Sequence, residues 1–252
     1  MTDPSFEVRA RSDVDYGSTL LLGTANPGLA GLTVGDYLVR STGTEPAGHV
    51  RALGLADVTP FTAGEPRHAF RLYPLAGADV TLLASEVFLP VGAAEEFASA
   101  LLGWADSAGV DEVAVCHGVP YPHGPEEHRV FHVATAGFRD RRLVGPDAAE
   151  PVVPPMPGGF LDGVVGELMT AGLEDETAVG VLVTPTHPPG PDLEAALRFL
   201  ETLESLYDLS VDPTALRERA EEQRRYFAEL ANRVESLDRG ETSDYPEDRM
   251  FM

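Results

Sequence analysis

Lysine is absent from this sequence of 252 residues, in which all 18 basic residues are arginine and 41 residues are acidic. The formal net charge of −23 is spread along the whole chain. At molar salt the Debye length falls to about 3 Å, so that like charges scarcely repel one another. The composition therefore predicts a protein adapted to very high salt, as in a halophilic organism.

Basic patches are also scarce, which argues against a nucleic-acid partner. A phosphate backbone is bound by clustered lysine and arginine side chains. The dense arginine groups here are Arg139 with Arg141 and Arg142, and the pair Arg224 and Arg225, and each group lies near acidic residues. We therefore expect no binding to nucleic acid.

The single cysteine, Cys116, excludes an internal disulfide and a cysteine-based zinc site. Residues 1–16 are polar and contain no apolar core of signal-peptide length. No apolar run approaches the roughly 18 residues that a membrane-spanning helix needs. The sequence thus predicts a cytoplasmic protein with no membrane segment.

Strand-like and helix-like segments alternate through residues 1–211, which we expect to form one α/β body. A near-continuous apolar run such as 111–116 or 178–184 is typical of a central parallel strand. The alternation predicts a three-layer α/β/α fold with a mostly parallel central sheet. The predicted strands are 18–23, 50–58, 67–73, 79–89, 111–116, 129–135 and 178–184, with 50–58 and 67–73 as a hairpin; the predicted helices include 32–39, 93–109 and one that follows the N-cap Asp192.

The glycines after the first strand, in Gly23-Thr-Ala-Asn-Pro-Gly-Leu-Ala-Gly31, do not have the spacing of a phosphate-binding loop. We expect them to serve a tight turn and close helix packing. Residues 141–157 are rich in proline and are expected to form a loop.

Histidine is concentrated after the strand 111–116, where four of the seven histidines lie. His117, His123, His128 and His132 are separated by 6, 5 and 4 positions, and these spacings match no standard zinc site. The sequence therefore predicts no metal and no cofactor.

A long helix is predicted over residues 212–239, with Asp212 as its N-cap, Pro213 in its first turn and Gly240 as its end. Its apolar positions, taken together with Gln223 between Ala220 and Phe227, are spaced alternately by four and three residues over about three heptads. This seam packs either on its own domain or against another subunit, and it consists of Leu216, Ala220, Phe227, Leu230, Val234 and Leu237.

An acidic tail, 240–252, is expected to be flexible and ends in Met250, Phe251 and Met252. Exposing a Met or Phe side chain forfeits roughly 1.5–3 kcal/mol of burial. The triplet is either a frayed end or a peptide that fills a pocket on another protein, with its carboxylate as an anchor.

Three segments taken in order resemble the archaeal branch of the proteasome assembly chaperone family over about residues 15–235. They are 23–38, which opens with the glycine-rich turn, then 158–168 (Gly-Gly-Phe-Leu-Asp-Gly-Val-Val-Gly-Glu-Leu), and 184–197 (Thr-Pro-Thr-His-Pro-Pro-Gly-Pro-Asp-Leu-Glu-Ala-Ala-Leu). The resemblance implies a nucleoside-phosphorylase-like fold, no catalysis and a homo-oligomer. It also implies C-terminal tails that insert into α-ring pockets of the proteasome core particle, for assembly or for activation.

The docking motif that this resemblance implies is a hydrophobic residue, a tyrosine and any residue. Met250, Phe251 and Met252 stand at these positions, so that Phe251 lacks the phenol hydroxyl and is expected to dock more weakly.

Two alternatives remain. One is a nucleoside-phosphorylase-like enzyme, whose candidate residues are His117, His123, Asp162 and His187, with Arg139, Arg141 and Arg142 as phosphate ligands. The other is a structural homo-oligomer whose tail has no partner.

Salt dependence of unfolding tests the predicted adaptation. We expect the thermal midpoint, followed by circular dichroism, to rise from dilute buffer to molar sodium chloride, because salt screens the repulsion among acidic side chains. Equal stability in dilute buffer would contradict it.

Overall fold

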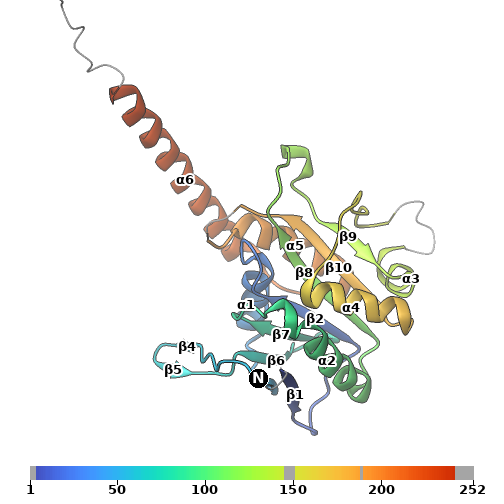
Figure 1. Cartoon of the computed structure of the whole chain (residues 1–252). Coiled ribbons are helices and arrows are strands. Elements are labelled where there is room, and N and C mark those ends of the chain that lie inside the picture. The colour runs from blue at the N-terminus through green and yellow to red at the C-terminus, as the bar shows by residue number, and fades with distance from the viewer. Residues whose placement is uncertain (1–3, 145–150, 188–189, 242–252) are drawn as a thin grey trace, which may run out of the picture.

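The computed structural model describes residues 4–144, 151–187 and 190–241. Its main sheet has eight strands in the order β1–β3–β6–β7–β2–β8–β10–β9 (Figure 1). A separate two-stranded ribbon pairs β4 with β5. The strands are β1 Ser5–Ala10, β2 Thr19–Thr24, β3 Gly48–Leu53, β4 Phe61–Thr62, β5 Glu65–Pro66, β6 Phe70–Pro74, β7 Val80–Ser85, β8 Glu112–Val119, β9 Phe131–Ala134 and β10 Ala178–Pro185.

The centre of the sheet is parallel: β2 lies between β7 and β8, and β10 lies beside β8. Antiparallel strands extend the sheet on both sides. Beyond β7 the order is β6, β3 and then β1, and β9 lies beside β10. The predicted hairpin is therefore confirmed as β3 and β6, and the predicted α/β/α fold with its parallel core is confirmed as well.

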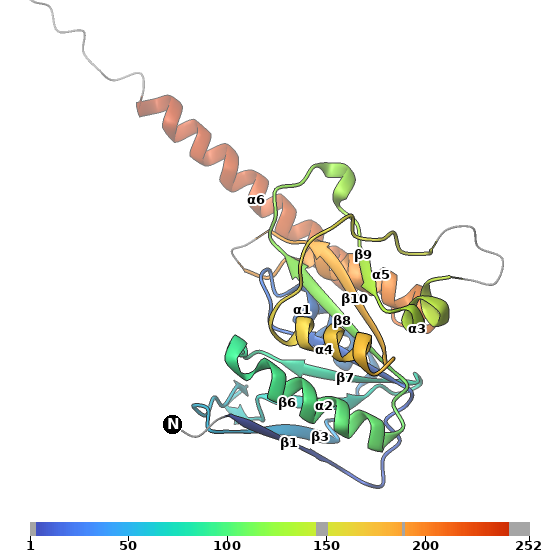
Figure 2. The same ribbon diagram turned by 45° about the vertical axis from the view of Figure 1, so that its right-hand side comes forward.

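Helices cover both faces of the sheet (Figure 2). Because successive side chains of a strand point to opposite faces, Leu21 packs in the core that contains α1 and α5, and its neighbours Leu20 and Leu22 pack in the core that contains α2 and α4. No helix within the described ranges is long and apolar enough to cross a membrane. The helices are α1 Ala30–Thr42, α2 Ala94–Ala108, α3 Ala136–Phe138, α4 Gly163–Glu174, α5 Leu193–Tyr207 and α6 Thr214–Glu241, with short helical turns at η1 Val91–Ala93, η2 Pro125–Glu127 and η3 Arg139–Leu143.

Some local predictions were wrong. The edge strand β1 was not predicted, although its Phe6 ring packs edge-on against Phe97 of α2, with 5.1 Å between the ring centroids. The segment predicted as a loop over 141–157 begins inside the helical turn η3.

Close packing explains the glycine-rich turn after β2. A Cβ atom on Gly31 would lie 2.5 Å from the Cys116 carbonyl oxygen, nearer than real Cβ contacts come. Gly28 has a φ of +76°, and a Cβ there would meet Thr186 at 2.5 Å. The predicted role of these glycines, a tight turn and close packing, is confirmed.

A buried ion pair joins β8 to η3. Glu112 is 1% exposed, and Arg142 Nε donates to its Oε1 at 2.7 Å. The Arg142 guanidinium also lies 4.7 Å from the centre of the Tyr207 ring. Arg142, which the enzyme alternative offers as a phosphate ligand, is therefore already engaged inside the body.

Replacing Arg142 tests this pair. We expect Arg142→Ala to lower the free energy of unfolding by about 3 kcal/mol, because it leaves a buried carboxylate without its cation. Arg141→Ala is the matched control: Arg141 is exposed and lies 4.0 Å from Asp111, so that its loss is expected to cost less than about 0.5 kcal/mol. Urea unfolding measures both, and equal effects would contradict the assignment.

Candidate interaction surface

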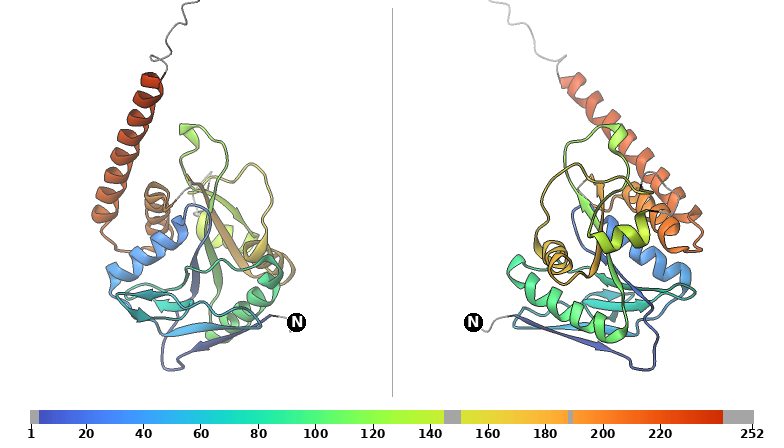
Figure 3. Two further views of the ribbon diagram at one scale, coloured as in Figure 1. Left: turned by 60° about the vertical axis from the view of Figure 1, so that its left-hand side comes forward. Right: turned by 90° about the vertical axis from the view of Figure 1, so that its right-hand side faces the viewer.

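Helix α6 leaves the body and projects away from it (Figures 1 and 3). Its start is fixed at Asp212, whose Oδ1 accepts a hydrogen bond from the Thr214 backbone N–H at 2.9 Å. Hydrogen bonding with the Thr214 side chain, and next with its backbone N–H, holds the pKa of Asp212 below its usual value. Asp212 lies two residues before the first residue of α6, and the Pro213 carbonyl accepts from the Arg217 N–H, so that the predicted N-cap is off by one position. The predicted end at Gly240 was wrong as well, because α6 continues to Glu241.

The first turns of α6 belong to the body. Leu216 and Ala220 are 1% and 3% exposed, and Leu216 lies in the core that contains α1 and α5. The Gln223 side chain accepts from the Leu193 backbone N–H at 3.3 Å and donates to the Pro191 carbonyl at 2.8 Å. Gln223 therefore ties α6 to the start of α5, and the next residue, Arg224, lies 3.6 Å from Glu194 of α5.

Beyond Gln223 the same apolar repeat faces solvent. We call three residues of this repeat, Phe227, Leu230 and Val234, together with the neighbouring Tyr226, the α6 stripe. The exposed fractions of Tyr226, Phe227, Leu230 and Val234 are 62%, 49%, 44% and 51%. The predicted seam is thus divided between residues buried in their own domain and residues that the single chain leaves uncovered. The side chain of Leu237 lies outside the described residues.

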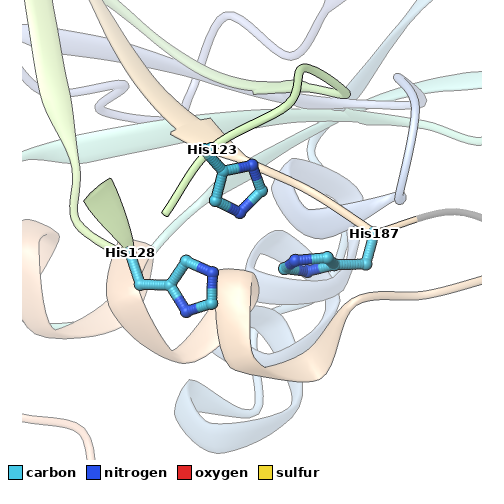
Figure 4. A group of neighbouring side chains, drawn as sticks. All are labelled: His123, His128 and His187. Carbon is cyan, nitrogen blue, oxygen red and sulfur yellow. The ribbon is translucent and has the colours of Figure 1, made fainter. Parts of the chain in front are cut away.

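Three histidines of the body converge in the connections that follow β8 and β10 (Figure 4). His123 and His128 lie in the connection from β8 to β9, and His187 lies between β10 and α5. Their ring centroids are 4.8 Å, 4.9 Å and 5.3 Å apart. The pKa of His128 lies below its usual value, first because of desolvation and then because of Arg198 and the other two histidines.

The grouping differs from the one considered in the sequence. His132 is buried in β9, where its Nδ1–H donates to the Val153 carbonyl at 2.7 Å. His117 lies in β8, where burial lowers its pKa against the opposing charge of Asp162. Neither joins the cluster. His123 and His187 were both named for the enzyme alternative, and the structure groups His128 with them. They meet because β8 and β10 are parallel and their carboxyl ends lie at one edge of the sheet.

Asp162 acts on His117 and is not part of the histidine cluster. Arg141 and Arg142 contact Asp111 and Glu112 at the opposite end of β8. Cys116 is fully buried, which raises the pKa of its thiol and makes it a poor nucleophile. A groove of about 680 Å³ lies elsewhere, lined by residues that include Val50, Phe70 and Phe88. None of the residues of the enzyme alternative lines it.

The sequence profile of the PAC2 family matches residues 20–231 of this chain. The chain belongs to the PAC2 family. Among curated proteins, none matches the sequence. The family match spans the whole parallel core and most of α6.

Solved structures share the fold of this PAC2 protein. Pyrococcus furiosus PbaA, described as an archaeal homologue of proteasome-assembly chaperone, has a TM-score of 0.75 at 17% identity, with 98% of this chain and 100% of that chain covered. P. furiosus PbaB, described as an archaeal proteasome activator, has a TM-score of 0.71 at 19% identity over 92% and 100%. A Thermoplasma acidophilum protein of unknown function has a TM-score of 0.71 at 24% identity over 90% and 91%.

Two leucines of α6 separate its buried and exposed parts. We expect Leu216→Ala to lower the free energy of unfolding by roughly 2–4 kcal/mol at any protein concentration, because it opens a cavity in the body. Leu230→Ala, the same substitution on the α6 stripe, is expected to cost less than about 0.5 kcal/mol in dilute protein. Urea unfolding at two concentrations measures both. A large cost of Leu230→Ala in dilute, monomeric protein would place the stripe in the core of its own domain.

Proposed function

We propose that this PAC2 protein is a non-enzymatic partner of the proteasome, an assembly chaperone or an activator, that acts in a saline cytoplasm. It docks Met250, Phe251 and Met252 into α-ring pockets of the core particle. The observation that carries the proposal is the projection of α6 from the body, with the sequence of the acidic tail following it. Family membership and the likeness to PbaA, a homologue of proteasome-assembly chaperone, and PbaB, a proteasome activator, support the same partner.

The projecting helix suits a tail that has to reach another protein. At 1.5 Å per residue, the 28 residues of α6 extend about 42 Å. Residues 242–252, which lie outside the described residues, follow this arm in the sequence. Docking would bury the apolar side chains of Met250 and Phe251 and would pair the Met252 carboxylate with a cation in the pocket.

One such tail is expected to bind weakly, because a short peptide loses conformational freedom on docking. Several tails on one oligomer raise the effective concentration and can increase the avidity by about 10²–10⁴-fold. The α6 stripe supports a homo-oligomer, since its spacing of three and four residues is that of a helix-to-helix seam and the single chain leaves it exposed. A second copy of this chain is the occupant that we propose for it.

Deletion of the triplet tests the docking. We expect the full-length chain to co-sediment with an archaeal proteasome core particle in high salt, and the chain lacking Met250 to Met252 to lose this binding while it keeps its circular dichroism spectrum. Tyr245→Ala, a change of an aromatic residue within the tail but outside the triplet, is the matched control and is expected to bind as the full-length chain does.

Restoring the phenol hydroxyl sharpens this test. Phe251→Tyr is expected to bind more tightly, because the phenol hydroxyl gains a hydrogen bond worth about 0.5–1.5 kcal/mol, or roughly 2- to 10-fold in affinity. Equal sedimentation of the full-length and deleted chains would move the contact to the body, and no sedimentation of either would refute docking.

A further inference from the structure

We propose that His123, His128 and His187 form a binding site for one divalent transition-metal ion of the zinc class. The three residues offer nitrogen atoms that all lie within 4.8 Å of one another. A point therefore exists that lies within about 2.8 Å of all three atoms, against a Zn–N bond of about 2.0–2.1 Å. Small rotations of the imidazole rings would close this difference, because two of the three side chains are exposed.

Hydrogen bonds fix which nitrogen of His123 can bind a metal. Its Nδ1 lies 2.6 Å from the Tyr121 carbonyl oxygen, which can only accept, so that Nδ1 carries the proton and Nε2 carries the lone pair. Nε2 is buried and has no hydrogen-bond partner. A buried, unpartnered acceptor is costly, and a metal ion bound at Nε2 would remove this cost.

His187 is arranged in the same way. Its Nδ1–H donates to Asp192 Oδ2 at 2.9 Å, which leaves Nε2 as the ligand atom. Asp192 is itself held, because its carboxylate accepts from the backbone N–H groups of His187 and Ala195, each at 2.9 Å. A carboxylate that orients a histidine through Nδ1 is the usual second shell of a zinc ligand. The N-cap of α5 therefore also holds a ligand of the proposed site.

One positive and one negative side chain of α5, Arg198 and Glu194, lie near the cluster, so that their charges together give a metal ion no net attraction. The affinity for the metal ion therefore has to come from the three histidines. Arg198 of α5 is close enough to affect His128, but its guanidinium is engaged, donating to Thr184 Oγ1 at 3.0 Å and to the Pro185 carbonyl at 2.8 Å. Glu194 opposes it from the same helix. Imidazole nitrogens without thiolates select Zn²⁺, Co²⁺, Ni²⁺ and Cu²⁺ over Ca²⁺ and Mg²⁺.

Three protein ligands leave a fourth position on a tetrahedral ion. His128 and His187 are exposed, so that this position opens to solvent and can hold water or a ligand atom from a partner. The ion would join the connection after β8 to the connection after β10, two segments that approach each other at the cluster (Figure 4). Binding is therefore expected to stabilise the folded chain.

Cobalt titration is the experiment, because tetrahedral Co²⁺ absorbs visible light far more strongly than the hydrated ion does. The chain is prepared without a histidine tag, stripped with a chelator and titrated in high salt, which suppresses weak binding to acidic side chains. We expect tetrahedral bands that saturate at one Co²⁺ per chain and that disappear when Zn²⁺ displaces it. Zn²⁺ is also expected to raise the thermal midpoint of unfolding.

The variants separate the cluster from histidines in general. His128→Asn and His187→Asn replace exposed side chains and are expected to weaken binding by at least about 100-fold, whereas Asp192→Asn, which keeps the N-cap, is expected to weaken it about 10-fold. His68→Asn, at an exposed histidine outside the cluster, is the control and leaves the titration unchanged. No tetrahedral bands up to millimolar Co²⁺, or bands that persist in both cluster variants, would overturn the proposal.

Discussion

Hydrogen bonds join the connections that follow β2 and β10 to each other and to the carboxyl end of β8, at one edge of the parallel strands. The positions of α5, α6 and the three histidines depend on this junction. Asn26, after β2, donates to the Cys116 carbonyl at 3.1 Å and accepts from the Gly118 N–H at 3.3 Å. Thr186, after β10, donates to the Pro27 carbonyl at 3.0 Å. The Asp192 N–H donates to the Gly28 carbonyl at 2.8 Å. Backbones that approach this closely leave room only for glycine at Gly28 and Gly118, where an added Cβ would overlap Thr186.

The junction positions both surfaces for which we propose a function. It fixes the start of α5, and the Pro191 carbonyl beside that start accepts the hydrogen bond from Gln223 that ties α6 to the body. It also fixes Asp192, which orients His187. The direction of the projecting helix and the meeting of the three histidines thus depend on the same few backbone contacts.

Sequence reasoning recovered what local patterns determine. Continuous apolar runs gave the parallel strands β2, β8 and β10, and a polar residue before an amphipathic repeat gave the N-cap Asp192, since each signal acts within a few residues. It failed for β1, whose short alternating pattern carries two charged residues and whose burial comes from α2, far away in the chain. Spacing along one loop likewise missed the histidine cluster, because His187 comes from another connection.

The heptad repeat of α6 shows a different limit. The same spacing of apolar residues packs a helix on its own domain or on a second subunit, so that the pattern left both alternatives open. The structure divides it at Gln223: Leu216 and Ala220 are buried before it, and Phe227, Leu230 and Val234 are exposed after it. The division lies where the contacts of α6 with the body stop. The periodicity of apolar residues along the helix does not predict this position.

The burial of an ion pair decides how strongly concentrated salt weakens it. Exposed pairs such as Arg9 with Glu7 are screened when the Debye length shrinks to about 3 Å. Arg71 is only 3% exposed and contacts Glu86 at 2.8 Å, and Glu112 with Arg142 is similarly withdrawn from solvent. Dissolved ions screen such partly buried pairs much less than exposed ones. Concentrated salt is therefore expected to weaken the interactions among surface charges and to leave these buried ion pairs intact.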